Sequence, residues 1–214
     1  MNQFFKKIYV ISSYPTQNRL NDLIPFLNKE NIQYELIISP KKKYFDDKND
    51  EGQWLGHKGD FSLISANESV FLKESYLKSE SFCILEDDIW FDINYKEKLN
   101  LFFADVPNDW EILNLGYHPH TSTSFNDNLS YYKLKRDEQI VGTPFVAYKN
   151  NVINYILEKI ESNIEPMDWF LSKTIYPNFN TYICMDKIFY QSSYRSYELD
   201  KNESYKKYKS EICL

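Results

Sequence analysis

The sequence contains no long hydrophobic run and few cysteines, and both features exclude classes of protein. No apolar segment approaches the roughly 20 residues that a transmembrane helix needs, and the opening MNQFFKKIYVISS lacks the cleavage-site pattern of a signal peptide. The three cysteines, Cys83, Cys184 and Cys213, are widely spaced and odd in number, which predicts neither a disulfide framework nor a zinc site. We therefore expect a cytoplasmic protein.

The chain also lacks an excess of positive charge. Its 214 residues carry a net charge of −6, which argues against broad binding to the phosphate backbone of nucleic acids. The length suits one domain with a sizeable core. Aromatic residues make up 17% of the chain, so we expect most of them in that core, with a few exposed rings able to stack on sugars.

Hydrophobic periodicity in the first 40 residues predicts alternating strands and helices. A strand is expected at 6–13, a helix near 20–27 with Pro25 inside it, and a second strand at 33–39. Strand, helix and strand within this length are typical of a parallel α/β sheet.

The later segments continue this alternation. Ser65 and Glu68 form a capping-box pattern, so we expect the next helix to begin at Ser65. Further strands are expected at 81–85, 109–117, 139–150 and 181–191, and further helices at 152–160 and 167–175.

Three consecutive acids, Glu86, Asp87 and Asp88, lie between the apolar segments 82–85 and 89–91. Ligands of open α/β sheets bind outside the carboxyl ends of the strands, which is where this triplet falls. Adjacent carboxylates repel one another unless a cation joins them, and their oxygens suit Mg²⁺ or Mn²⁺, ions that clamp a diphosphate. The triplet therefore predicts a metal site, and a solvated turn is the other interpretation.

Several segments resemble, in order, those of glycosyltransferase family 25, the lipopolysaccharide and collagen galactosyltransferase group. CILEDDIWF resembles its acidic segment, and the other pieces are IYVISSYPTQNRLNDLIPFLNKENIQYELI, WEILNLGY, GTPFVAYKNNVINYILE, EPMDWFL and IFYQSSYRS. Together they span about residues 8–196. The resemblance implies a GT-A-like (Rossmann-like) fold: a single α/β domain with a mixed, mostly parallel central sheet flanked by helices.

The chain departs from the family pattern at three places that bear on the donor, and one is the absence of a Ser-Asp pair after the Gln of IFYQSSYRS. Ser12-Ser13-Tyr14 stands where the family has Asn-Leu-Asp, and Ser65-Ala66 stands where it has Ser-His. We therefore expect a divergent member. One glycosyltransferase domain would cover 1–214, with a nucleotide-sugar half at about 1–92, an acceptor half at about 93–196, and a polar tail or linker at 197–214.

Candidate site residues follow from these motifs. Asp168 is the predicted general base, although an acid beside a helix start also suits an N-cap or first-turn position. The predicted metal ligands are Glu86, Asp87 and Asp88. The predicted donor-binding residues are Ser12, Ser13, Arg19, Lys58, Ser65 and Asp87, and the predicted acceptor-binding residues are Gly142, Thr143, Trp169 and His118.

The function that the resemblance implies is transfer of a hexose, galactose or glucose, from a UDP-sugar to a glycan or other hydroxyl acceptor. Such an acceptor would resemble lipopolysaccharide, lipooligosaccharide or a glycoprotein, with Mn²⁺ or Mg²⁺ as cofactor and inversion at the sugar carbon. Two other functions stay open. Metal-dependent sugar nucleotidyl transfer usually needs a Gly-rich loop after the first strand, and SSYPTQNR has no glycine. A non-catalytic glycan-binding domain would leave the acid triplet without a role.

Overall fold

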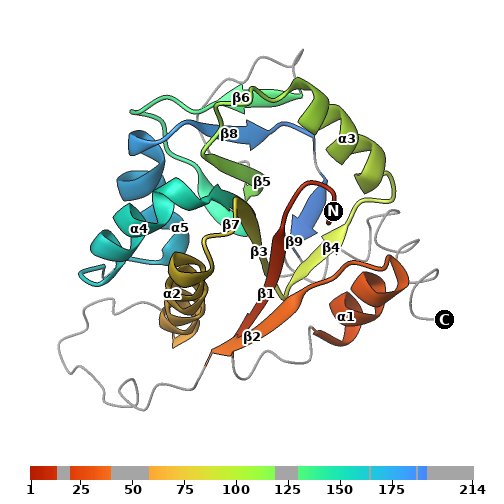
Figure 1. Cartoon of the computed structure of the whole chain (residues 1–214), viewed down its shortest axis with the longest axis horizontal. Coiled ribbons are helices and arrows are strands. Elements are labelled where there is room, and N and C mark those ends of the chain that lie inside the picture. The colour runs from red at the N-terminus through yellow and green to blue at the C-terminus, as the bar shows by residue number, and fades with distance from the viewer. Residues whose placement is uncertain (14–19, 40–57, 119–129, 164, 187, 192–214) are drawn as a thin grey trace.

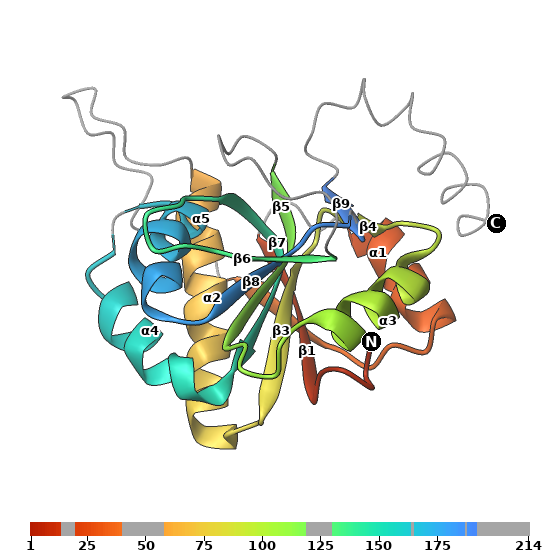
Figure 2. The ribbon, with the colours of Figure 1, turned by 90° about the horizontal axis from the view of Figure 1, so that it is seen from above.

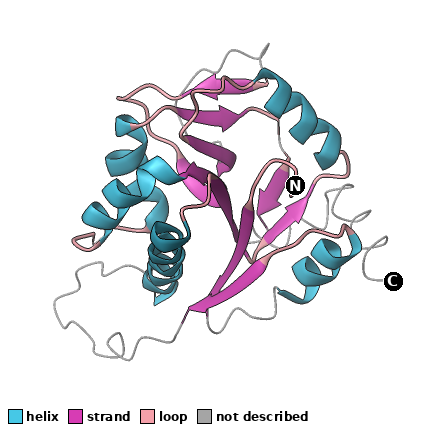
Figure 3. Ribbon diagram, in the orientation of Figure 1, coloured by secondary structure: helices cyan, strands magenta, loops and turns pink. Residues whose placement is uncertain are grey.

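The computed structural model describes residues 1–13, 20–39, 58–118, 130–163, 165–186 and 188–191. These residues form one α/β domain in which strands and helices alternate up to β3 and are then grouped less regularly (Figure 1, Figure 3). Its strands are β1 (Lys7–Ser13), β2 (Glu35–Ser39), β3 (Ser81–Glu86), β4 (Ile89–Phe91), β5 (Ile112–His118), β6 (Tyr131–Lys133), β7 (Val141–Lys149), β8 (Thr181–Cys184) and β9 (Phe189–Gln191). Its helices are α1 (Leu20–Lys29), α2 (Lys58–Leu77), α3 (Tyr95–Asp105), α4 (Ile153–Ile160) and α5 (Met167–Phe170), with the short turns η3 (Asn150–Val152), η4 (Leu171–Ile175) and η5 (Tyr176–Asn178).

The central sheet has seven strands in the order β2-β1-β3-β7-β5-β8-β6. β1 is parallel to β2 and to β3, and β5 is parallel to β8. β7 lies in the centre and is antiparallel to β3 and to β5, and the edge strand β6 is antiparallel to β8. The predicted mixed sheet flanked by helices is therefore confirmed, with parallel and antiparallel pairs in equal number because β7 and β6 both run against their neighbours.

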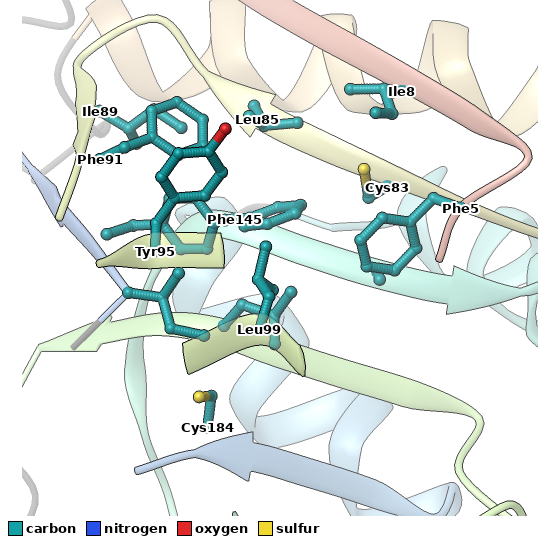
Figure 4. Packing of buried hydrophobic residues seen from close by; sticks show 14 of the residues in the cluster. Phe5, Ile8, Cys83, Leu85, Ile89, Phe91, Tyr95, Leu99, Phe145 and Cys184 are labelled. Atoms are coloured by element: carbon teal, nitrogen blue, oxygen red, sulfur yellow. The ribbon is translucent and has the colours of Figure 1, made fainter. Parts of the chain in front are cut away.

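Helices cover both faces of this sheet. α2, α4 and α5 lie on one face, and α1 and α3 lie on the other (Figure 2). Side chains alternate along a buried strand, so Phe82 and Ile84 of β3 join the core cluster under α2 and α4, whereas Cys83 and Leu85 join the opposite cluster. Figure 4 shows the second of these clusters, where Leu85 and Cys83 lie near Phe145 and Phe5. β3 is buried on both faces, as its continuous apolar run predicts.

The segment 181–191, expected as one strand, forms two strands in different sheets. β8 joins the central sheet, and β9 pairs antiparallel with β4, directly after the acid triplet. The physical reason is aromatic packing, because the ring of Phe189 lies 4.8 Å from that of Phe91 and 4.4 Å from that of Phe145. This second small sheet explains why apolar residues resume immediately after the acids.

The expectation that the second helix begins at Ser65 is wrong. α2 begins at Lys58, and Ser65 lies inside the helix with 7% of its surface exposed. Burial of the helix face that contains Ala66 and Val70 outweighs the local capping preference of Ser65. α2 has 20 residues, but neither it nor any other helix in the described part of the chain is both long and apolar enough to cross a membrane.

A buried hydrogen bond joins α2 to the central sheet and should contribute to stability. The Tyr9 hydroxyl donates to Glu74 Oε1 over 2.5 Å, and both residues are fully buried. A hydrogen bond to a charged group contributes about 1.5–3 kcal/mol. Tyr9→Phe should therefore lower the free energy of unfolding by that amount, measured by urea denaturation. Tyr76→Phe, at a residue that is 84% exposed, is the control, and equal stabilities of the two variants would contradict the prediction.

Candidate functional site

The acid triplet lies at the carboxyl end of β3, in the middle of the central sheet. Because β1 is parallel to β3 and β7 is antiparallel to it, the carboxyl end of β1 and the amino end of β7 meet the triplet at the same edge. This arrangement brings Ser12, the acids and Thr143 together although they are far apart in sequence. It is the location that open α/β sheets use for ligands.

The three acids are buried, which contradicts the interpretation as a solvated turn. Exposed fractions are 9% for Glu86, 6% for Asp87 and 5% for Asp88. Two of them accept hydrogen bonds from hydroxyl groups. Thr143 Oγ1 donates to Glu86 Oε1 over 2.8 Å, and Ser12 Oγ donates to Asp87 Oδ2 over 2.5 Å. Buried carboxylates are retained only where such donors or a cation stabilise them.

The triplet spans the last residue of β3 and the turn that follows, and Glu86 and Asp87 have different hydrogen-bond partners. Glu86 continues the face of Phe82 and Ile84, whereas Asp87 bonds to Ser12, which lies on the face of the other core cluster. Among the described residues, no group of three or more His, Cys, Asp or Glu side chains is arranged to hold a metal ion.

The donor set nevertheless fits a hard cation shared with a diphosphate. Mg²⁺ usually binds through one or two carboxylates and takes its other ligands from waters and substrate phosphates. The pKa of Glu86 is raised to about 8. Burial is the main cause, the negative charges of Asp88, Asp168 and Asp87 also raise it, and the Thr143 hydrogen bond lowers it. A divalent cation would offset that repulsion. The metal assignment of Glu86, Asp87 and Asp88 stays a prediction.

Gly142 connects the triplet to Asp168. Its backbone N–H donates to Asp168 Oδ2 over 3.3 Å, and its φ of 91° is a conformation that favours glycine. The next residue, Thr143, bonds to Glu86. Hydrogen bonds from two adjacent residues at the start of β7 therefore connect β7 to Asp168, the predicted base, and to Glu86, a predicted metal ligand.

Asp168 occupies the first turn of α5, where Pro166 and not Asp168 is the N-cap residue. Its Oδ1 accepts from the backbone N–H of Trp169 over 2.8 Å, as an acid in a first turn does. The side chain is half-buried, so its carboxylate is fixed and still open to a ligand. Trp169 is 40% exposed beside it, with Lys173 Nζ 4.6 Å from the ring centre.

Two residues that sequence reasoning missed complete the group. The fully buried amide of Asn114, in β5, donates to the Gly142 carbonyl over 3.0 Å and to the Tyr176 hydroxyl over 3.2 Å. Burial raises the pKa of Tyr176, the Asn114 hydrogen bond opposes this, and the charges of Asp168 and Glu86 raise it further. The signal was present in EILNLGY, where Asn114 is the one polar side chain between apolar neighbours.

The structure leaves the other predicted residues untested. Ser13 ends β1, His118 ends β5 and Lys58 begins α2, but only the backbones of these three residues are described. Arg19 and the tail 197–214 lie outside the described residues. Ser65 is buried inside α2, and its role in donor binding stays a prediction.

The raised pKa of Glu86 predicts a pH-dependent stability. Its folded pKa of about 8 exceeds the ordinary value of 4.5, so the unfolded state loses its proton first as pH rises. The free energy of unfolding should fall between about pH 4.5 and 8, by at most about 1.4 kcal/mol per pH unit from this group, and level off above that window. Glu86→Gln should remove this component and be more stable than the parent at pH 8.

Urea denaturation at several pH values measures this difference. Glu97→Gln, at an exposed position of α3, controls for the loss of one charge and should follow the parent curve. Parallel pH profiles for the parent protein and Glu86→Gln would contradict the prediction.

Comparison with known proteins supports the fold. No protein-family model and no curated protein matches the chain. Among solved structures, a glycosyltransferase involved in the glycosylation of the major capsid of PBCV-1 matches with a TM-score of 0.51 and 9% identity, over 95% of this chain and 99% of that one. An inositol-1-phosphate CTP transferase from T. maritima (TM-score 0.44, 14% identity, 96% and 78% covered) and a putative glucose-1-phosphate thymidylyltransferase from Bacillus anthracis (0.43, 11%, 96% and 94%) are less similar.

At such low identity a likeness shows the fold alone. The chain therefore shares its α/β architecture with the PBCV-1 glycosyltransferase, which confirms the predicted GT-A-like fold. Membership of family 25 stays a prediction.

Proposed function

We propose that this chain is a divalent-metal-dependent glycosyltransferase that moves a hexose, galactose or glucose, from a UDP-sugar to a hydroxyl group of a glycan. The observation that carries the proposal is the buried acid triplet at the carboxyl end of β3, served by the hydroxyls of Ser12 and Thr143. Burying three acidic side chains lowers the stability of the fold, and acids in such a position are typical of catalytic or binding sites.

The triplet would hold the cation with few protein ligands. Asp88 would bind it together with Glu86 or Asp87, and Ser12 would keep the Asp87 carboxylate oriented. When bound, Mn²⁺ or Mg²⁺ supplies positive charge that stabilises the leaving diphosphate. Ser12, the second-last residue of β1, lies beside the triplet and would also face the nucleotide.

Asp168 would act as the general base. Its carboxylate accepts hydrogen bonds from the N–H groups of Gly142 and Trp169, and these bonds hold it in one orientation. The acceptor hydroxyl would lose its proton to Asp168 as its oxygen attacks the sugar carbon, with inversion of configuration. The exposed ring of Trp169 would line the acceptor side, and the resemblance to family 25 favours lipopolysaccharide-like or glycoprotein acceptors.

Slow hydrolysis of a panel of UDP- and GDP-sugars tests this proposal. The parent protein should cleave one UDP-hexose with Mn²⁺ and lose that activity in EDTA. Asp88→Asn and Asp168→Asn should each lower the rate by on the order of 10²-fold or more. Glu97→Gln, at an exposed position of helix α3, should keep the parent rate.

Two outcomes would contradict the proposal. Cleavage that is equal with and without metal, or equal in Asp88→Asn, would remove the triplet from the reaction. Pyrophosphate release from UTP and a sugar 1-phosphate, without cleavage of any nucleotide sugar, would instead indicate nucleotidyl transfer.

A further inference from the structure

A concave site lies at the edge of the central sheet opposite to the acid triplet. It is a cavity of about 610 Å³, within the range of small-molecule sites. Glu111 immediately precedes β5 and Asn180 immediately precedes β8, so the cavity is at the amino ends of these two parallel strands. β5 runs in the direction of β3 because both are antiparallel to β7, and the acid triplet therefore lies at the other edge.

One wall of this cavity, formed by the end of β6 and the residues that follow it, is basic. It contains Lys133, Lys135 and Arg136, on a chain whose net charge is −6. Lys133 Nζ lies 3.7 Å from Asp109 and Lys135 Nζ lies 3.4 Å from Glu138. Within the described residues Arg136 is exposed and has no ion-pair partner, so its guanidinium can bind an incoming group.

The acid that lines the cavity is already engaged. Glu111 Oε1 accepts from Asn151 Nδ2 over 2.5 Å and Oε2 accepts from the Asn180 N–H over 2.9 Å, so this carboxylate holds the wall together. The negative charges of Asp109, Glu111 and Glu138 balance those of the nearby lysines, so the long-range electrostatic attraction of an anion to the cavity is small. Selectivity for an anion would come from the paired N–H groups of Arg136, which match a carboxylate or phosphate in a bidentate way.

The facing wall combines apolar and amide surface. Pro177 and Phe179 line it, and the Phe179 ring is held by Tyr155 at 5.4 Å between ring centres. The Nδ2 groups of Asn178 and Asn180 donate hydrogen bonds to the carbonyls of Thr174 and Asp109. Their Oδ1 atoms can therefore accept hydrogen bonds from a ligand. An apolar surface beside acceptors and donors suits a sugar ring, which has an apolar face and a rim of hydroxyls.

We propose that this cavity binds an acidic saccharide, a sugar ring that carries a carboxylate or a phosphate. The ring lies against Phe179 and Pro177, and its anionic group binds Arg136. The saccharide class rests in part on the proposed function, since a glycosyltransferase meets glycans, whereas the anionic group follows from the cavity alone. Tyr176 lines the cavity, and its hydroxyl accepts from Asn114, which also donates to the Gly142 carbonyl at the start of β7, so a chain of contacts connects the cavity to the acid site.

Calorimetric titration of the full chain tests the proposal with four ligands: glucuronate, glucose 6-phosphate, glucose and inorganic phosphate. At least one of the two acidic sugars should bind at least 10-fold more tightly than both glucose and phosphate. Arg136→Gln should weaken that binding at least 10-fold, and Arg136→Lys, which keeps the charge without the fork, should also weaken it. Lys6→Gln, an exposed residue near the N-terminus, matches the charge change and should bind as the parent does.

Three results would overturn the proposal. They are no binding of either acidic sugar, equal binding of the acidic sugar and of phosphate or glucose, and unchanged binding in Arg136→Gln with the fold intact by circular dichroism. Asp88→Asn separates this proposal from the proposed function, because it should abolish nucleotide-sugar cleavage and leave saccharide binding unchanged. Saccharide binding without cleavage of any nucleotide sugar would support the cavity and contradict the transferase.

Discussion

The constraint on which this structure depends is the burial of β3 on both faces up to and including its final residue, Glu86. A strand in that position has no solvent side, so acids at its end must find partners in the protein or in a ligand. Glu86, the last residue of β3, bonds to Thr143, and Asp87, in the turn that follows, bonds to Ser12. The antiparallel direction of β7 supplies the first of these partners, and the parallel direction of β1 supplies the second.

This arrangement is costly for folding and useful for chemistry. Burial and neighbouring carboxylates raise the pKa of Glu86 to about 8, so a side chain that would be charged in water is held close to neutral. Buried acids of this kind concentrate at functional sites because a cation or substrate can offset the cost on binding. Asn114 and Tyr176 stiffen the same region, since one amide connects β5 to the start of β7 and to η5. The site is thus built before any ligand arrives.

Local patterns predicted much of the fold and the location of the acids, but not the contacts among them. The apolar runs of β1, β3 and β5 and the amphipathic pattern of α4 were read correctly because burial dictates their periodicity. The separation of β8 and β9 was missed because it depends on Phe189 packing against Phe91 and Phe145. The role of Asn114 was missed for the same reason, because its partners Gly142 and Tyr176 are distant in sequence. Helix α3 was missed although its buried residues Tyr95, Leu99 and Phe102 have helical spacing. Ser65 was misplaced because tertiary burial outweighed a local capping signal.

The measurement that tests the central claim most directly is a crystal structure of the protein with Mn²⁺ and UDP, with the metal located by its anomalous signal. The account predicts one Mn²⁺ at the carboxyl end of β3, coordinated by Asp88 with Glu86 or Asp87 and by the diphosphate. A nucleotide bound elsewhere, or a metal peak away from these carboxylates, would contradict it.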